Sequence, residues 1–256
     1  MISVLHLGVL DYATGLKLQN RLVDLRKQGA IGDVLLLLEH PPVITLGRNA
    51  KAANIIAAPE LLSRRGVEVF ESDRGGDVTF HGPGQLVGYP IFDLRAFPSN
   101  EENRKTLGAI EYVRRLEEVL IRACATFGIA TKRIPGLTGV WTETDAKIAA
   151  LGVHISRGVT SHGLALNVTT DLSFFNLIIP CGITTKPVTS MAKELGNPPS
   201  MEEVANTVSR QFGQVFGSQM LWLDSLDSLL GPPVGVPMQP PMELRKIHPE
   251  DDSAWA

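Results

Sequence analysis

Residues 74–85, RGGDVTFHGPGQ, place two pairs of glycines around one arginine and one histidine. Glycine adopts positive φ and lets backbone N–H groups approach a ligand closely, so this mixture is typical of a binding loop. Residues 78–80 have β propensity, and residues 85–94 continue as a mostly apolar strand pattern. We therefore expect a binding loop anchored in a β-sheet. The alternative is a hairpin with two structural turns, in which Arg74 and His81 are solvated.

Strand and helix patterns follow one another irregularly along the rest of the chain. Strand patterns occur at residues 2–7, 33–39, 67–71, 85–94, 139–141, 148–156 and 163–169. The spacing of apolar residues predicts helices at residues 13–28, 60–65, 101–127 and 201–216. Ser99, three residues before Glu102, predicts a capping box at the start of the third helix. This mixture indicates an α+β fold in a single domain.

The end of the chain has a different composition. Prolines gather at positions 232, 233, 237, 240 and 241, and such a segment is typically extended or disordered. We predict a catalytic domain over residues 1–220 and a proline-rich extension, extended or disordered in part, over residues 221–256.

The two cysteines lie in different contexts. Cys181 follows Pro180 and precedes Gly182, which suits a tight turn that presents a thiol beside backbone amides able to stabilise an oxyanion. Cys181 is therefore a candidate nucleophile, although a lone cysteine is also commonly a small buried hydrophobe. Cys124 lies within a helical pattern, and we expect it to be structural.

A cysteine thiol has a pKa of about 8.5, so little of it is ionised at neutral pH. A catalytic cysteine therefore needs a cationic or basic neighbour. Lys147, which opens the apolar run 147–155, is the candidate, and the alternative is a solvated lysine at a strand end. In the later strand 161–168, Gly163 and Ala165 leave one face small and make room for an apolar ligand. The alternative for Gly163 is a β-bulge.

Composition limits the function classes. With 256 residues, 44% of them hydrophobic, and a formal net charge of −3, the chain is expected to be one soluble domain that does not bind nucleic acid. Two cysteines do not indicate a disulfide framework, which favours a reducing compartment. No apolar run reaches the length of a membrane span and no segment has the pattern of a signal peptide, so we expect a cytoplasmic protein that does not associate with membranes.

Four segments in a fixed order, residues 74–90, 147–152, 162–168 and 179–183, resemble the motifs of the lipoyl(octanoyl) transferase family, also called lipoate-protein ligase B. The resemblance covers about residues 1–215. It implies a biotin/lipoate-protein-ligase-like domain, related to class II aminoacyl-tRNA synthetases, with a mixed sheet packed by helices. It also implies an acyltransferase that uses neither metal nor other cofactor.

The resemblance implies specific residue roles. Cys181 would carry an acyl thioester and Lys147 would tune it, with His81 as a second candidate base or a group that orients the loop. The substrate pocket would be formed by Arg74, Gly75, Gly76, Asp77, Val78, Thr79, Phe80, His81, Ala150, Leu151, Gly152, Gly163, Leu164 and Ala165.

The partners implied are octanoyl acyl carrier protein as donor, and as acceptors the lipoyl domains of 2-oxoacid dehydrogenases and the glycine cleavage H protein. A monomer is expected.

Two alternative functions share parts of this pattern. An ATP-dependent lipoate or biotin ligase also has a glycine-rich loop and a lysine, but it needs no thiol. A non-catalytic relative would bind acyl groups or carrier proteins without turnover.

Overall fold

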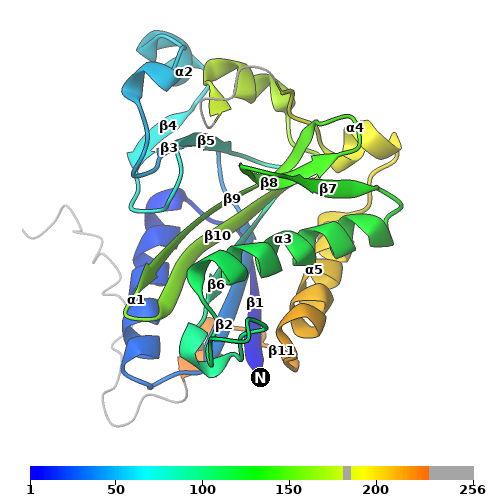
Figure 1. The fold of residues 1–256 in the computed structure, drawn as a ribbon. Helices are drawn as coiled ribbons and strands as arrows, with labels where there is room; N and C mark the ends of the chain where they lie inside the picture. Colours follow the sequence, from blue (N-terminus) through cyan, green and yellow to red (C-terminus); the bar gives the residue numbers. More distant parts are fainter. Residues whose placement is uncertain (181–185, 231–256) are drawn as a thin grey trace, which may run out of the picture.

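The computed structural model describes residues 1–180 and 186–230. These residues form an eight-stranded mixed sheet in the order β11-β1-β2-β6-β10-β9-β8-β7 (Figure 1). In this sheet the pairs that β1 makes with β11 and β2 are parallel, and the other strand pairs described are antiparallel. The strands are β1 (Ile2–Val9), β2 (Asp33–Glu39), β6 (Gln85–Ile91), β7 (Thr131–Ile134), β8 (Leu137–Thr142), β9 (Lys147–Ser156), β10 (Val159–Asn167) and β11 (Met220–Trp222).

Strand β2 explains why the sheet lies in the centre of the molecule. Leu35 and Leu37 pack into the core on one face of the sheet, and Leu36 and Leu38 pack into the core on the other. Since successive side chains of a strand point to opposite faces, a run of leucines is stable only where both faces are covered.

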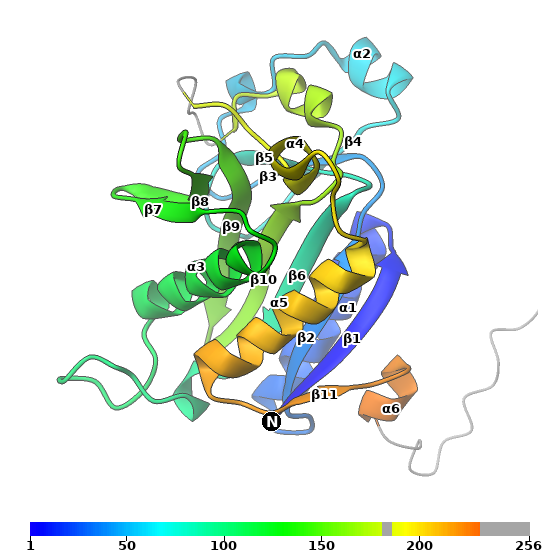
Figure 2. The same ribbon diagram turned by 90° about the vertical axis from the view of Figure 1, so that its right-hand side faces the viewer.

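Helices cover both faces of this sheet. Helices α3 (Ala109–Thr126) and α5 (Met201–Phe216) pack side by side on one face, and α1 (Tyr12–Lys27) lies on the other (Figures 1 and 2). Short elements complete the described chain: η1 (Ala52–Asn54), η2 (Leu94–Ala96), α4 (Met191–Leu195) and α6 (Leu226–Leu230). Within residues 1–180 and 186–230, no helix is long and apolar enough to cross a membrane.

A second sheet of three strands, in the order β4-β3-β5, lies at one end of the molecule (Figure 1). It consists of β3 (Val43–Leu46), β4 (Glu68–Glu71) and β5 (Val78–His81), and it packs with α2 (Pro59–Arg64) and η3 (Leu172–Leu177) around a core of its own. The binding loop therefore continues from β5 in the small sheet to β6 in the large sheet. Since β5 pairs with β3 and β6 pairs with β2 and β10, the hairpin alternative is wrong.

Several predicted elements are confirmed, and others need correction. The strand at 33–39 and the helix at 201–216 have the predicted bounds. The predicted helix at 101–127 begins only at Ala109, and the capping box of Ser99 and Glu102 is wrong, because the Ser99 hydroxyl donates instead to Glu111 Oε2 at 2.6 Å. The predicted strand at 85–94 ends at Ile91.

The sheet extends across the expected domain boundary at residue 220. Strand β11 pairs in parallel with β1, with Met220 opposite Ile2 and Trp222 opposite Val4. The first residues of the expected extension thus belong to the large sheet. Residues 231–256, where the prolines gather, lie outside the described part of the chain.

Candidate active site

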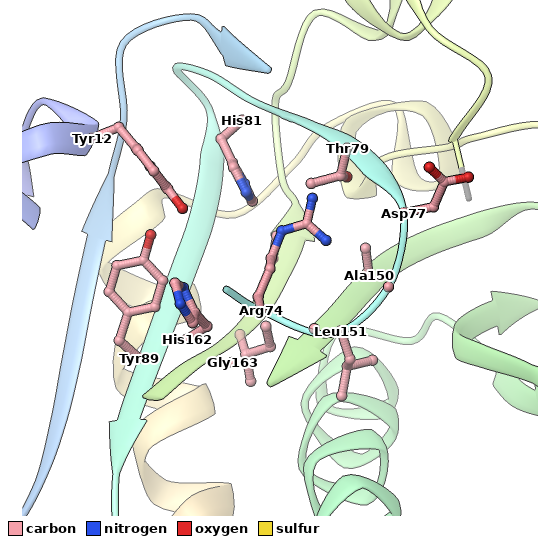
Figure 3. A pocket seen from close by; sticks show the side chains of 14 residues that line it. Tyr12, Arg74, Asp77, Thr79, His81, Tyr89, Ala150, Leu151, His162 and Gly163 are labelled. Atoms are coloured by element: carbon pink, nitrogen blue, oxygen red, sulfur yellow. The ribbon is translucent and has the colours of Figure 1, made fainter. Parts of the chain in front are cut away.

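A cavity, here the central cavity, lies between the binding loop and strands β9 and β10 (Figure 3). Among the described residues, its lining consists of Tyr12, Arg74, Gly76, Asp77, Thr79, His81, Tyr89, Ala150, Leu151, Gly152, His162, Gly163, Leu164 and Ala165. Most of the predicted pocket residues are thus brought together.

The alternation of strand β5 decides which loop residues reach the central cavity. Thr79 and His81 line it, whereas Val78 and Phe80 point the other way into the core of the small sheet, where they are 0% and 1% exposed. Val78 and Phe80 are therefore not part of the cavity wall, contrary to prediction. Gly75 lines a neighbouring groove instead.

Arg74 is buried and joins the binding loop to strand β3. Its Nε and Nη2 donate to Thr45 Oγ1 at 3.1 and 2.8 Å, and Nη2 also donates to the Thr45 carbonyl at 2.6 Å. Nη1 donates to the carbonyl of Gly75 at 3.1 Å. The guanidinium thus fixes the shape of the loop at the cavity wall, and the alternative in which Arg74 is solvated in a hairpin is wrong.

Two glycines outside the binding loop let it approach closely. A Cβ at Gly47 would lie 2.4 Å from the carbonyl oxygen of Gly76, and a Cβ at Gly152 would lie 2.8 Å from that of Gly75. The Gly75 N–H also donates to the carbonyl of Val153 at 2.9 Å. The loop therefore rests on bare backbone at both sides, which no residue with a side chain permits.

His81 is buried and neutral. Burial lowers the pKa of His81 to about 3. Its Nδ1–H donates to Gln85 Oε1 at 2.7 Å, because Gln85 Nε2 donates to Asn167 Oδ1 at 2.9 Å and leaves Oε1 as the acceptor. Asn167 Nδ2 in turn donates to the carbonyl of Thr189 at 2.9 Å. An imidazole with so low a pKa is a weak base near neutral pH, and its ring is held in place by these hydrogen bonds.

The far end of the central cavity, defined by Tyr12, Tyr89 and His162, is polar (Figure 3). His40 Nδ1 lies 2.6 Å from the carbonyl of Leu10, so it carries the proton, and His40 Nε2 accepts from the Tyr89 hydroxyl at 2.6 Å. Burial raises the pKa of Tyr89 and lowers the pKa of His40. These groups stay neutral and close the cavity with fixed hydrogen bonds.

Asp73 connects the binding loop to the two strands beneath it. Its carboxylate accepts from His162 Nε2 at 2.7 Å and is also bonded to His154. His162 belongs to β10 and His154 to β9. Asp73 thus holds the start of the loop over both strands of the cavity floor.

The β-bulge alternative for Gly163 is wrong. Strand β10 pairs with β9 without a shift in register from Val159 to Leu166, and Gly163 lies within this stretch.

Lys147 is buried at the start of β9, with 7% of its surface exposed, so the solvated alternative is wrong. Its Nζ lies 4.7 Å from the centre of the Trp141 ring, a cation–π distance. Its backbone N–H donates to the carbonyl of Pro187 at 2.8 Å and its carbonyl accepts from Thr189 at 2.9 Å. The segment that follows the undescribed residues 181–185 is therefore fixed against Lys147.

Lys147 and Pro180 line a second, smaller cavity, here the reactive end. Thr79, Ala150 and Ala165 line both this cavity and the central cavity. The two spaces are therefore neighbours that share a wall. Cys181, the predicted nucleophile, lies outside the described residues, and its neighbour Pro180 is the closest described point of the chain.

Cys124 has the predicted structural environment. It is 0% exposed within the α3 core, and burial raises the pKa of its thiol to about 12. Such a thiol stays protonated and unreactive.

Tyr12, Tyr89 and His162 belong to the cavity wall but were not predicted. Each comes from a different element, α1, β6 and β10. Of these three, His162 is next to a predicted pocket residue, Gly163, and this adjacency is the sequence signal that could have identified it. Among the described residues no cluster of histidine, cysteine, aspartate and glutamate has a geometry that holds a metal ion.

Comparison with known proteins agrees with this architecture. Residues 11–213 match the family model of the lipoyl protein ligase A/B catalytic domain. An octanoyltransferase of Koribacter versatilis is 62% identical over 253 residues, which cover 98% of each chain. An octanoyltransferase of Acidobacterium capsulatum is 58% identical over 237 residues, covering 90% of this chain and 96% of the relative.

Among solved structures, a lipoate-protein ligase A bound with ATP superimposes with a TM-score of 0.67 at 16% identity, covering 88% of this chain and 89% of the other. At that identity the likeness shows the fold alone, and it confirms the predicted lipoate-ligase-like mixed sheet. From the matched family model and the close sequence relatives, the chain belongs to the lipoyl protein ligase A/B catalytic-domain family, among the acyltransferases called octanoyltransferases.

Proposed function

We propose that this acyltransferase moves an octanoyl group from acyl carrier protein to a lysine of a lipoyl domain, through a thioester on Cys181. The observation that carries the proposal is the shared wall between the central cavity and the reactive end. Thr79, Ala150 and Ala165 line both spaces, and Lys147 lies in the reactive end. A chain attached beside Pro180 then has an apolar path past Ala150 toward Tyr12.

The acyl chain would gain its binding energy in the central cavity. Leu151, Leu164 and Ala165 supply apolar wall, and burial of each methylene stabilises the complex by about 0.8 kcal/mol. The polar far end limits the length of the chain, because a longer chain would have to displace the hydrogen-bonded Tyr89 and His40. The site therefore favours a medium-length saturated acyl group.

In the first step, the Cys181 thiol passes its proton to the neutral amine of Lys147, and the thiolate attacks the carbonyl carbon of the donor thioester. The tetrahedral intermediate collapses with cleavage of the bond to the carrier sulfur, which takes the proton back from the Lys147 ammonium. One thioester replaces another, so the step is close to isoenergetic and needs no ATP. Lys147 acts as base and then as acid.

In the second step, an acceptor lysine attacks the acyl-enzyme. A lysine with its ordinary pKa of about 10.4 arrives as an ammonium and must lose a proton before its nitrogen can attack. That proton goes to solvent. As the neutral nitrogen attacks, Lys147 Nζ takes a second proton from it, the bond between the carbonyl carbon and the Cys181 sulfur breaks, and the sulfur receives this second proton from Lys147. The product is an amide, which makes this step strongly downhill.

His81 does not serve as the base in this proposal. With a pKa of about 3, its protonation at pH 7 would cost about 5 kcal/mol. Its hydrogen bond to Gln85 and the onward bond to Asn167 instead brace the wall between the two cavities.

An ATP-dependent ligase is the main alternative, because lipoate-protein ligase A shares the fold. A transfer assay separates the two. We expect octanoyl transfer from octanoyl acyl carrier protein to an apo lipoyl domain without ATP, and no transfer from free octanoate with ATP and Mg²⁺. Activity only in the second mixture would contradict the proposal.

The remaining assignments follow from the resemblance and from composition. We propose the lipoyl domains of 2-oxoacid dehydrogenases and the glycine cleavage H protein as acceptors. A catalytic domain over residues 1–220, a monomeric state and a cytoplasmic location also remain predictions.

A further inference from the structure

Glu117 on α3 carries a carboxylate whose side chain is 0% exposed. It accepts from Arg114 Nη1 at 2.7 Å and from Arg133 Nε at 3.1 Å, both on Oε2. Its other oxygen, Oε1, accepts from the backbone N–H of Gly139 on strand β8 at 3.1 Å. A helix side chain therefore holds the backbone of β8 at one point.

That point lies against the side chain of Lys147. Gly139 has φ of +138°, and a Cβ at this position would lie 3.0 Å from Lys147 Cε and 3.0 Å from the carbonyl oxygen of Ala149. The Lys147 side chain thus crosses the bare backbone of Gly139. Its course depends on where Glu117 holds that backbone.

The pairing of β8 with β9 is irregular at the same place. Val140 pairs with Ala149 but Trp141 pairs with Lys147, so Ile148 is the extra residue of a bulge. A bulge leaves its extra residue without a ladder partner and re-aims the side chains beside it. The Trp141 ring beneath Lys147 Nζ belongs to the same segment of β8.

We propose that Glu117 is a positioning residue, which fixes Lys147 Nζ at the reactive end through Gly139. This inference rests on the proposed role of Lys147. Burial of a charged network is a weak source of stability by comparison with apolar packing. The neighbouring Glu118 forms comparable ion pairs, with Arg122 and Arg133, while its side chain stays 31% exposed. Ion pairing on α3 therefore does not require a buried carboxylate. Of these two glutamates, Glu117 is the one that also bonds to the backbone of β8.

The experiment measures the pH midpoint of iodoacetamide labelling at Cys181, read by mass spectrometry of the peptide that contains it. Lys147→Ala should raise the midpoint by about one unit or more, as loss of a neighbouring cation does. Glu117→Leu should raise it in the same direction. Glu117→Gln, which keeps an oxygen for the Gly139 N–H, should stay near the parent protein. Glu118→Leu is the matched control, because it removes ion pairs of α3 without touching β8, and it should leave the midpoint unchanged.

A double variant shows whether the effect passes through Lys147. In the Lys147→Ala background, Glu117→Leu should cause no further shift. An unchanged midpoint in folded Glu117→Leu, or a shift of equal size with and without Lys147, would overturn the inference while leaving the proposed function intact. An unchanged midpoint in Lys147→Ala would overturn both.

If Glu117→Leu does not fold, Gly139→Ala tests the same contact, because its added Cβ must displace Lys147 Cε. Gly136→Ala is its control, since Gly136 also has positive φ, +79°, but its Cβ would meet nothing within 4 Å. A raised midpoint for Gly139→Ala alone supports the inference. Equal midpoints in the two variants would overturn it.

Discussion

The two ends of the proposed substrate site differ in kind. The reactive end is lined by a basic side chain, Lys147, on a bulged strand. At the far end, Tyr89 is neutral and its hydroxyl already donates to the neutral His40. We therefore expect changes at the reactive end to abolish or strongly slow the reaction. Changes at the far end and along the wall should have smaller effects, on the preferred length of the acyl chain or on the stability of the fold.

The largest effect is expected at Cys181. Cys181→Ala should abolish both acyl-enzyme formation and transfer, because no other group supplies a covalent nucleophile for the first step. Cys124→Ala is the control and should lower the free energy of unfolding by about 1–2 kcal/mol while turnover persists. Transfer assays and denaturant unfolding of both variants make the comparison. Residual turnover above a trace in Cys181→Ala would refute covalent catalysis.

Lys147→Arg should lower kcat by about 100-fold or more, the usual weight of a general acid–base. Arginine keeps the positive charge but does not release a proton near neutral pH, so it separates charge stabilisation from proton transfer. Steady-state rates with octanoyl acyl carrier protein measure the loss. If Lys147→Arg retained most of the activity, charge alone would be the contribution of this residue.

Along the wall, Ala150→Leu should shift the preference toward shorter donors. Loss of space for two methylenes changes relative rates by about tenfold, at about 0.8 kcal/mol for each methylene. Gly76 is unsuited to this test, because its φ of +89° makes any side chain there strained. Rates with hexanoyl, octanoyl and decanoyl carrier proteins provide the measurement. An equal loss for all three donors would argue that Ala150 does not line the path of the chain.

The smallest effect concerns the pH dependence of stability. His81 has a pKa of about 3 when folded and an ordinary pKa of about 6.5 when unfolded. Between these values the unfolded chain binds the extra proton, so stability is complete above pH 6.5 and falls as the pH is lowered. The loss from His81 should be about 1 kcal/mol at pH 5.5.

His81→Asn should therefore flatten the stability profile between pH 7 and pH 5.5, measured by urea unfolding. His40 and His162 also have pKa values lowered by burial, and both are present in the parent protein and in the variant. The difference between the two stability profiles therefore gives the contribution of His81. Parallel profiles would contradict the neutral assignment.

Local patterns predicted those elements whose partners lie nearby in the sequence. Helix α5 starts at a capping box in which Ser200 and Glu203 bond to each other's backbone, and it ends at Gly217 in the left-handed conformation. Both signals lie within one turn of the helix ends. Strand β2 was equally clear, because its continuous apolar run needs cover on both faces.

Features set by tertiary contacts were missed. The start of α3 was predicted too early, since the hydroxyl of Ser99 bonds to Glu111 rather than capping the helix locally. Tyr12 and Tyr89 meet only because of the order of the strands and the position of α1. The contiguous loop motif also placed Val78 and Phe80 in the pocket, although strand alternation turns them into the small core.

The most direct test of the account is the mass of the intact protein after mixing with octanoyl acyl carrier protein in the absence of ATP and acceptor. The account predicts an added octanoyl group, located on the peptide that contains Cys181, which disappears when an apo lipoyl domain is added and reappears on that domain. A protein that transfers the octanoyl group but never carries it would contradict the account.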